Sequence, residues 1–211
     1  MFRRVRILGV TEPIKTQVKN GVAWRVAGQA DVDWIMDGTE PGRRITAAIP
    51  PMFAAYATLT DAGEPEMPRN LSLEHRQDLA FVDVLRRHSR DMAWWIGYLD
   101  TGASDIVFWD APKVTLYEGW HYVFVLAGPE QAATWRPALG GHPNWKSTEL
   151  PEVIFPEDRS WLVSFRWDDD WACIGGPEAL INDVLDDPVL APNARRVDTQ
   201  QDATPPGDWP G

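Results

Sequence analysis

The chain has 211 residues, of which 44% are hydrophobic and 24% charged, and its formal net charge is −11. This length fits one large domain or two small ones, and the composition is that of a chain with a packed core. So large a negative charge repels phosphate backbones and anionic lipids, which argues against nucleic-acid binding and against membrane binding through a basic face. The single cysteine, Cys173, excludes an internal disulfide. No apolar run approaches the roughly 18 to 20 residues of a membrane span, and the apolar run in the start MFRRVRILGV is too short for that of a signal peptide, so we expect a cytoplasmic protein.

The first part of the chain predicts short strands joined by tight turns. Residues 2–10 and 21–28 read as strands, and Asn20-Gly21 is typical of a two-residue hairpin turn. The apolar run from Ile45 to Leu59 is interrupted at Pro50-Pro51. This run fits either a helix that starts at Pro51 or a buried strand, because short apolar runs are compatible with both.

The middle of the chain predicts a long helix followed by strands. Ser72 can cap a helix over SLEHRQDLAFVDVLRRHSR, in which Leu79, Val82 and Leu85 recur at helical spacing. The segments MAWWIGYLDTG and DIVFWDAPKVTLYEGWHYVFVLAGP then favour strands. Residues 129–136 predict a short helix with proline at its first position. This mixture predicts an α+β fold with a mixed or mainly antiparallel sheet and a few packed helices.

The end of the chain is the most acidic part. Residues 151–211 carry thirteen Asp/Glu and four Lys/Arg, a net charge of −9. We expect a single domain over residues 1–186, with residues 1–62 as an alternative N-terminal subdomain. Residues 187–211 are rich in Pro and Asp and are expected to form a C-terminal tail.

Three aspartates, Asp168 to Asp170, lie between two tryptophans in WLVSFRWDDDWACIGGPEAL. The alternation on either side predicts a hairpin with this three-residue loop, in which Phe165 faces Cys173 and Val163 faces Gly175. One core face would then contain Trp161, Val163, Phe165, Trp167, Trp171 and Cys173. Aspartate suits such a turn because its side chain bonds nearby backbone N–H groups. Gly175-Gly176-Pro177 would open a helix over EALINDVLDD.

No metal or cofactor site is predicted. Loops that bind hard cations space their carboxylates two apart and include a glycine at the bend, and DDDWACIG lacks that spacing. The four histidines, His75, His88, His121 and His142, stand in no zinc-binding motif. Cys173 is expected to be a buried strand residue rather than a nucleophile.

Asp100-Thr101-Gly102 resembles the active-site triplet of aspartic proteases, in which two carboxylates share a proton. The resemblance covers three or four residues only, and a turn between two strands explains the triplet as well. Asp100 and the strand residue His121 are the two candidate catalytic residues, and the rest of the sequence shows no catalytic constellation.

A broader resemblance rests on YLDTG, DAPKVTLYEGW, YVFVLAGPEQAATWR, RSWLVSFRWDDDW and CIGGPEALI. This combination resembles a family of uncharacterised bacterial proteins, over most of residues 45–186, and implies a single fold without an activity. The acidic, tryptophan-rich α+β chain is also similar in type to immunity proteins of polymorphic toxin systems.

These observations favour a non-catalytic binding protein of the immunity or antitoxin type, which would inhibit a basic protein partner. Its predicted contacts are Asp168, Asp169, Asp170 and Trp145. One alternative is a small hydrolase or ligand-binding enzyme with a pocket lined by Trp94, Trp95 and Trp120 and with Asp100 or His121 as base. The other is a structural or regulatory domain.

Overall fold

The computed structural model describes residues 15–61, 71–100, 108, 110–136, 150–165 and 171–203. Its strands are β1 (Thr16–Lys19), β2 (Val22–Val26), β3 (Ala55–Thr60), β4 (Trp94–Leu99), β5 (Val114–Leu116), β6 (Trp120–Ala127), β7 (Val153–Pro156), β8 (Leu162–Phe165), β9 (Trp171–Gly176) and β10 (Ala194–Val197). Its helices are α1 (Gln29–Gly38), α2 (Leu71–Arg87), α3 (Pro129–Thr134) and α4 (Glu178–Asp186), with a short 3₁₀ turn η1 (Ile45–Ala47).

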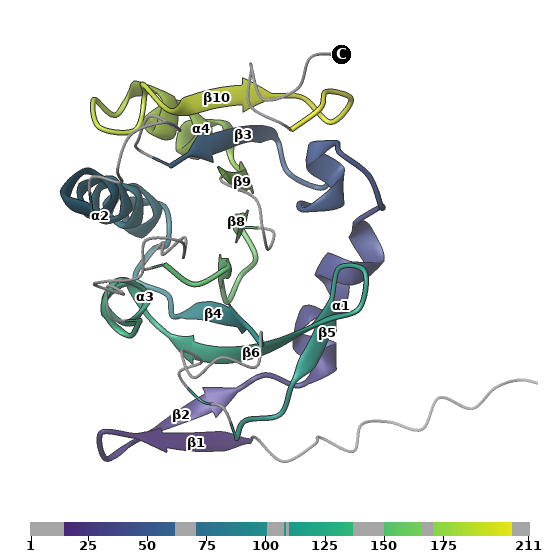
Figure 1. Cartoon of the computed structure of the whole chain (residues 1–211), viewed down its shortest axis with the longest axis vertical. Coiled ribbons are helices and arrows are strands. Elements are labelled where there is room, and N and C mark those ends of the chain that lie inside the picture. Colours follow the sequence, from purple (N-terminus) through teal and green to yellow (C-terminus); the bar gives the residue numbers. More distant parts are fainter. Residues whose placement is uncertain are drawn as a thin grey trace, which may run out of the picture.

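In the described ranges, all ten strands belong to one curved antiparallel sheet (Figure 1). Their order is β1-β2-β6-β4-β7-β8-β9-β3-β10, and β5 pairs with β6 beside this path. Helices α2, α3 and α4 bury side chains against one face, and α1 and η1 bury side chains against the other. The expected α+β fold with a mainly antiparallel sheet is therefore confirmed, although the sheet dominates over the helices.

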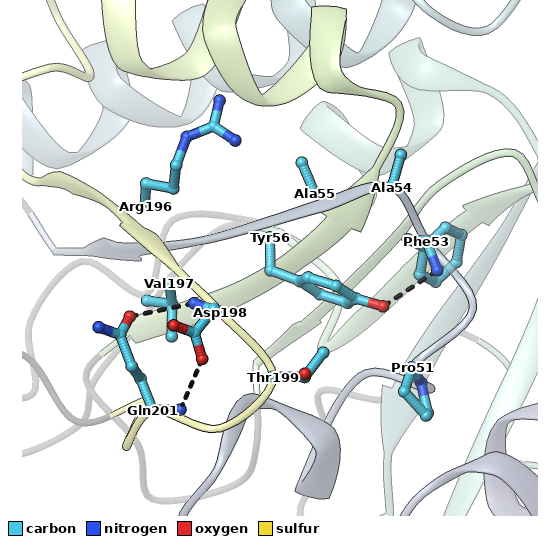
Figure 2. Close-up of a pocket in the computed structure, with 10 residues that line it drawn as sticks. All are labelled: Pro51, Phe53, Ala54, Ala55, Tyr56, Arg196, Val197, Asp198, Thr199 and Gln201. Carbon is cyan, nitrogen blue, oxygen red and sulfur yellow. Dashed lines mark hydrogen bonds between the residues drawn. The ribbon is translucent and has the colours of Figure 1, made fainter.

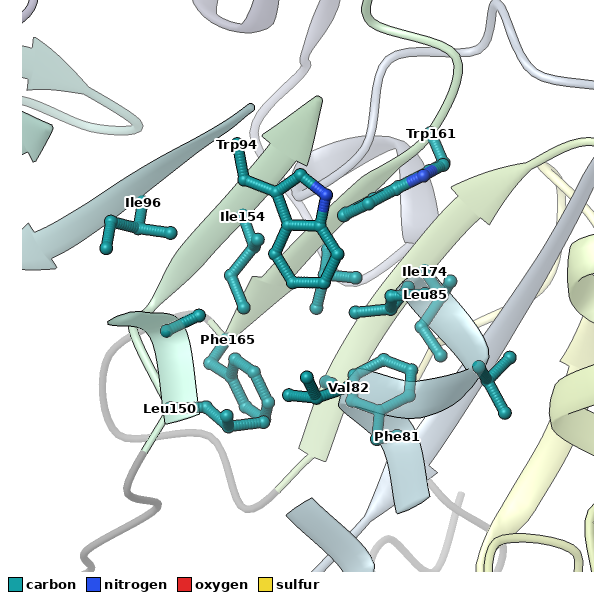
Figure 3. Close-up of a cluster of buried hydrophobic side chains, with 14 of the residues drawn as sticks. Phe81, Val82, Leu85, Trp94, Ile96, Leu150, Ile154, Trp161, Phe165 and Ile174 are labelled. Atoms are coloured by element: carbon teal, nitrogen blue, oxygen red, sulfur yellow. The ribbon is translucent and has the colours of Figure 1, made fainter. Parts of the chain in front are cut away.

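The central strands are buried on both faces. Every residue of β4, β7 and β8 is buried, so successive side chains enter the two different cores. Trp94 packs in the core under α2 and α4, whereas Trp95 packs in the core under α1. Figure 3 shows Phe81, Val82 and Leu85 of α2 directed at the sheet in the first of these cores.

The indole of Trp94 connects this core to the end of α2. Its Nε1–H donates to the Ser89 hydroxyl (2.8 Å), which donates to the Leu85 carbonyl (2.6 Å). The ring of Trp161 meets the Trp94 ring edge to face, with the centroids 5.2 Å apart. Such pairs add about 0.5 to 1.5 kcal/mol beyond the area they bury, so this contact ties β4 to the residue before β8, while the hydrogen bonds through Ser89 tie β4 to the end of α2.

The turn predicted at Asn20-Gly21 is present. Lys19 pairs with Val22 across a two-residue loop, and Asn20 and Gly21 have φ values of 53° and 77°. These are the positive φ values that a type I′ hairpin turn requires. Helices α3 and α4 also lie where the sequence predicts them, and α4 buries Leu180, Ile181 and Val184 as expected.

Two features of the first half of the chain go beyond the sequence-based prediction, which left the run after Pro51 open between a helix and a buried strand. The run after Pro51 forms strand β3, not a helix, because it is buried on both faces between β9 and β10. Helix α1 was not predicted, although Val32 and Ile35 are buried one turn apart. Its start is fixed by Asp31, whose carboxylate accepts the Gly28 N–H (2.9 Å).

The β8–β9 hairpin has a different register from the predicted one. Phe165 pairs with Ala172 rather than Cys173, and Val163 pairs with Ile174 rather than Gly175. A slip of one residue moves side chains to the other face of a sheet. Cys173 therefore packs in the core under α1, opposite to the face of Trp161, Val163 and Phe165. The connecting residues 166–170 lie outside the described residues.

Part of the segment expected to be a tail contributes to the sheet. β10 pairs with β3, with Val197 opposite Tyr56 and Ala194 opposite Leu59. Arg44 and Asp202 form a further bridge between this end of the chain and the segment before η1.

None of the helices in the described ranges is both long enough and apolar enough to cross a bilayer.

A glutamine side chain covers the outer edge of β5. The Gln29 amide nitrogen donates to the Thr115 carbonyl (3.0 Å), and the Gln29 amide oxygen accepts the Thr115 N–H (2.8 Å). The primary amide thus makes the same pair of bonds that a neighbouring strand would make. These two hydrogen bonds of Gln29 hold the start of α1 against β5.

Gly97 in β4 permits close packing of an aromatic ring. A Cβ at this position would lie 2.4 Å from the Phe124 ring. We expect Gly97→Ala to lower the free energy of unfolding by about 1 to 3 kcal/mol, because an added methyl in a packed core forces neighbours apart. Denaturant unfolding measures this, and the loss should be smaller in a Phe124→Leu background. Equal losses in both backgrounds would show that the ring contact is not the cause.

Candidate binding sites

All four predicted contact residues, Asp168, Asp169, Asp170 and Trp145, lie outside the described residues. The strands on either side of residues 166–170 end at Phe165 and begin at Trp171. The other two predicted site residues, Asp100 and His121, are described and lie next to each other.

Asp100 and His121 meet at one end of the sheet, where β4 ends beside β6. The Asp100 N–H donates to the His121 carbonyl (2.8 Å), and the Asp100 carboxylate contacts the Lys113 ammonium. The His121 ring is exposed, and its Nδ1 lies 3.3 Å from the Thr115 hydroxyl. The two residues are therefore neighbours in the sheet, but the Asp100 carboxylate bonds Lys113 and the His121 imidazole bonds Thr115.

The three tryptophans expected around a pocket do not share one. Trp94 and Trp95 are 0% and 5% exposed and lie on opposite faces of β4. Trp120 is 36% exposed at the start of β6. The strand alternation that buries both neighbouring indoles also separates them.

A buried ion pair lies near the same end of the sheet. The Arg136 side chain is 7% exposed, and its two guanidinium nitrogens lie 2.8 and 3.0 Å from the Glu152 carboxylate oxygens. Glu152 also accepts the Leu99 N–H (3.0 Å), and Arg136 donates to the Leu150 carbonyl (3.2 Å). The guanidinium stacks 5.2 Å above the Tyr98 ring. These bonds satisfy both charges internally, which gives the cluster a structural role.

Tyr98 beneath this pair is fully buried, and within the described part of the chain its hydroxyl has no hydrogen-bond partner. Burial raises the pKa of Tyr98 strongly, nearby Arg136 lowers it, and Glu152 raises it further. The net direction is upward because the phenolate would be formed in an apolar environment.

A small acidic pocket lies at the carboxyl end of α1. This cavity of about 250 Å³ is lined by Met36, Thr39, Glu40, Pro41, Ala47, Tyr117, Glu118 and Gly119, which define the acidic pocket. Its walls are largely apolar, and its two carboxylates come from segments that are far apart in the sequence. The Tyr117 hydroxyl fixes the inner wall by hydrogen bonds with the Ala48 carbonyl (3.0 Å) and the Ser164 hydroxyl (2.8 Å).

The charge around the acidic pocket is negative. Helix α1 carries Asp31, Asp33 and Asp37 and no basic residue, and among the described residues only Asp31 of these three has an ion-pair partner, Arg25 at 3.0 Å. The carboxyl end of a helix bears roughly half a negative charge. Within the described ranges, Glu40 forms no ion pair. A cation in this pocket would therefore meet carboxylates and the helix end together.

A larger groove of about 520 Å³ lies between the start of β3 and the turn after β10 (Figure 2). Its polar groups bond each other: Asp198 and Gln201 exchange side chain–backbone hydrogen bonds, and Arg196 reaches Glu178 (2.9 Å). The Tyr56 hydroxyl accepts the Phe53 N–H (3.0 Å), and burial raises its pKa. This groove offers few unused polar groups to a ligand.

No group of three or more His, Cys, Asp or Glu suited to a metal ion occurs in the described ranges. Sequence reasoning did not find the acidic pocket, because Glu40 and Glu118 come together only when α1 packs beside the β5–β6 turn. Comparison of the chain with protein-family models, with curated proteins and with solved structures finds no match.

Replacing Tyr98 by phenylalanine should leave stability unchanged or raise it, because the removed hydroxyl is desolvated without a partner. The raised pKa adds a pH dependence: above about pH 10 the unfolded chain loses this phenolic proton first, so native stability falls. Tyr98→Phe should weaken that alkaline fall. Denaturant unfolding at neutral and alkaline pH measures both effects. A loss of more than about 1 kcal/mol at neutral pH would reveal a hydrogen bond of this hydroxyl.

Glu152→Gln should destabilise the protein by about 3 to 5 kcal/mol, because it leaves the buried Arg136 charge unpaired. The double variant Glu152→Gln/Arg136→Met should recover part of this loss, since both charges are then absent. Urea unfolding of the three proteins measures the coupling. Additive losses would show that the two side chains do not stabilise each other.

Proposed function

We propose that the chain is a non-catalytic binding protein for a basic protein partner, and that the acidic pocket receives a lysine or arginine side chain of that partner. The observation that carries the proposal is a cavity with apolar walls and two carboxylates at the negative end of a helix. Lysine and arginine have an apolar stem, which matches the apolar walls of the pocket. They also have a cationic head, which matches its two carboxylates.

The charge of the whole chain supports the same class of partner. A net charge of −11 attracts a basic protein over distances beyond direct contact and speeds the encounter. Met36, which lines the pocket, is 40% exposed, as expected of a flexible apolar side chain at an interface. An immunity or antitoxin-type inhibitor of a basic toxin domain is the finer form of this proposal.

The sequence-based contacts Asp168, Asp169, Asp170 and Trp145 remain part of the proposal as a second contact region. Reversing the charge of all three aspartates should weaken the complex and reduce its dependence on salt. Unchanged affinity and unchanged salt dependence would remove this region from the interface and leave the acidic pocket to be tested separately.

Affinity capture of the tagged protein from its native lysate at low salt, with elution by a salt step and mass spectrometry, tests the function itself. The expected result is one stoichiometric basic protein that salt releases. A bait that recovers no basic partner would contradict the proposal.

Glu40→Gln/Glu118→Gln should weaken binding of the purified captured partner by about tenfold or more, because a desolvated charge pair is lost. The matched control is Asp83→Asn/Asp186→Asn, which changes the net charge equally on α2 and α4 across the sheet. Titration calorimetry of both variants separates a local contact from overall charge. Equal weakening by the two variants would show that only net charge matters.

The alternative of a small enzyme rests on one specific observation, the adjacency of Asp100 and His121 at the end of β4. If this alternative holds, a hydrolase screen of the purified protein would detect an activity that His121→Ala abolishes while the fold is unchanged. Absence of such an activity would contradict this alternative.

A further inference from the structure

The start of the chain differs in charge from the rest. Residues 1–14 carry Arg3, Arg4 and Arg6 against one glutamate, a net charge of +2, so the remaining residues carry −13 of the total of −11. None of the other stretches outside the described ranges has a net positive charge. Residues 1–14, which we call the basic segment, are therefore the part of the chain most strongly attracted by the acidic surface of the rest.

The basic segment joins the described structure close to helix α1. The Lys15 carbonyl accepts the Val26 N–H (2.9 Å), and Val26 lies only three residues before the first residue of α1. Those three residues span at most about 11 Å, and the ten residues of α1 add about 15 Å. The acidic pocket at the carboxyl end of α1 is therefore within roughly 30 Å of Lys15.

The arginines of the basic segment can cover this distance. Arg6 precedes Lys15 by nine residues, which extend to about 30 Å, and Arg3 and Arg4 have a longer reach. A tether of this length holds a side chain near its target at an effective concentration on the order of millimolar. The basic segment is thus long enough to meet the acidic pocket of its own molecule.

An acidic face of α1 leads from the start of the helix toward the pocket. Asp33 and Asp37 are four residues apart and so lie on one side of the helix. Within the described part of the chain neither has an ion-pair partner, and Asp33 accepts only the Gln29 amide (3.0 Å). A chain with several arginines would find a carboxylate at each end of this face and in the pocket beyond it.

The acidic pocket is of a size for one long side chain. Its volume of about 250 Å³ lies below the roughly 300 to 1,000 Å³ of pockets that bury drug-sized molecules. Met36, Pro41 and Ala47 supply apolar walls for the stem of an arginine, and Glu40 and Glu118 supply carboxylates for its head. An arginine of the chain itself and a cationic side chain of a partner would therefore exclude each other.

We propose that the basic segment occupies the acidic pocket of its own molecule when no partner is bound, with one arginine in the pocket and the others against Asp33 and Asp37. This inference rests on the proposed function in that the pocket must accept a cationic side chain. The segment then competes with the partner. Only ligands that bind more strongly than the tethered arginines displace it, which raises the selectivity of the pocket.

Fluorescence anisotropy with a labelled synthetic peptide of residues 1–14 tests the proposal on the full chain. The decisive variant is Arg3→Gln/Arg4→Gln/Arg6→Gln, which removes the internal competitor. The matched control is Arg86→Gln/Arg87→Gln/Arg90→Gln, which changes the net charge equally at exposed positions at the end of α2. This control separates relief of competition from the greater attraction of a more acidic chain.

The peptide should bind the decisive variant about tenfold more tightly than the wild type or the control, because the pocket of the variant is open at all times. Adding Glu40→Gln/Glu118→Gln to the decisive variant should remove that gain. Equal binding to the wild type and the decisive variant, an equal gain in the control, or no peptide binding at all would overturn the proposal.

The same variants distinguish this inference from the proposed function. If a captured partner depends on Glu40 and Glu118 but the peptide does not, the pocket keeps its proposed function and occupation by the basic segment is refuted. If the peptide depends on both carboxylates and no basic partner is captured, the internal contact is supported and the proposed function is contradicted.

Discussion

The burial of one sheet on both faces is the constraint on which the rest of this structure depends. Side chains of β4, β7 and β8 alternate between two cores, and none of their positions is left for solvent. A charge buried beside such a sheet needs a partner of opposite charge, as Arg136 has in Glu152. Binding chemistry is therefore confined to the margins of the sheet, where strands end and helices begin. The acidic pocket lies at such a margin.

The same constraint decides how much of the fold the sequence predicts. Local signals suffice for the Asn20-Gly21 turn and for α4, since turn chemistry and helical spacing act within a few residues. The run that becomes β3 is ambiguous, because a strand buried on both sides has no alternation to distinguish it from a helix. The register of β8 and β9 depends on the length of their connection, which the aspartates do not define.

The candidate sites are less predictable than the elements because each is assembled from distant segments. Glu40 and Glu118 are unremarkable exposed acids until α1 and the β5–β6 turn bring them to one cavity. Trp24 and Trp135 likewise meet only when α3 folds back beside the hairpin. The tryptophan excess in the sequence indicates aromatic surfaces, but strand alternation decides which of them are accessible. It buries Trp94 and Trp95 and leaves Trp24 partly exposed.

The glutamine that bonds the edge of β5 has a consequence for how the protein behaves in a crowded solution. An open strand edge is a template for uncontrolled growth of sheets between molecules. The Gln29 amide occupies both backbone groups of Thr115 and so closes this edge from within the molecule. Because these groups are already bonded, the Gln29 side chain opposes fibrillar self-assembly through this strand edge. It also shows that a single peptide-like amide is a sufficient partner for a strand edge in this fold.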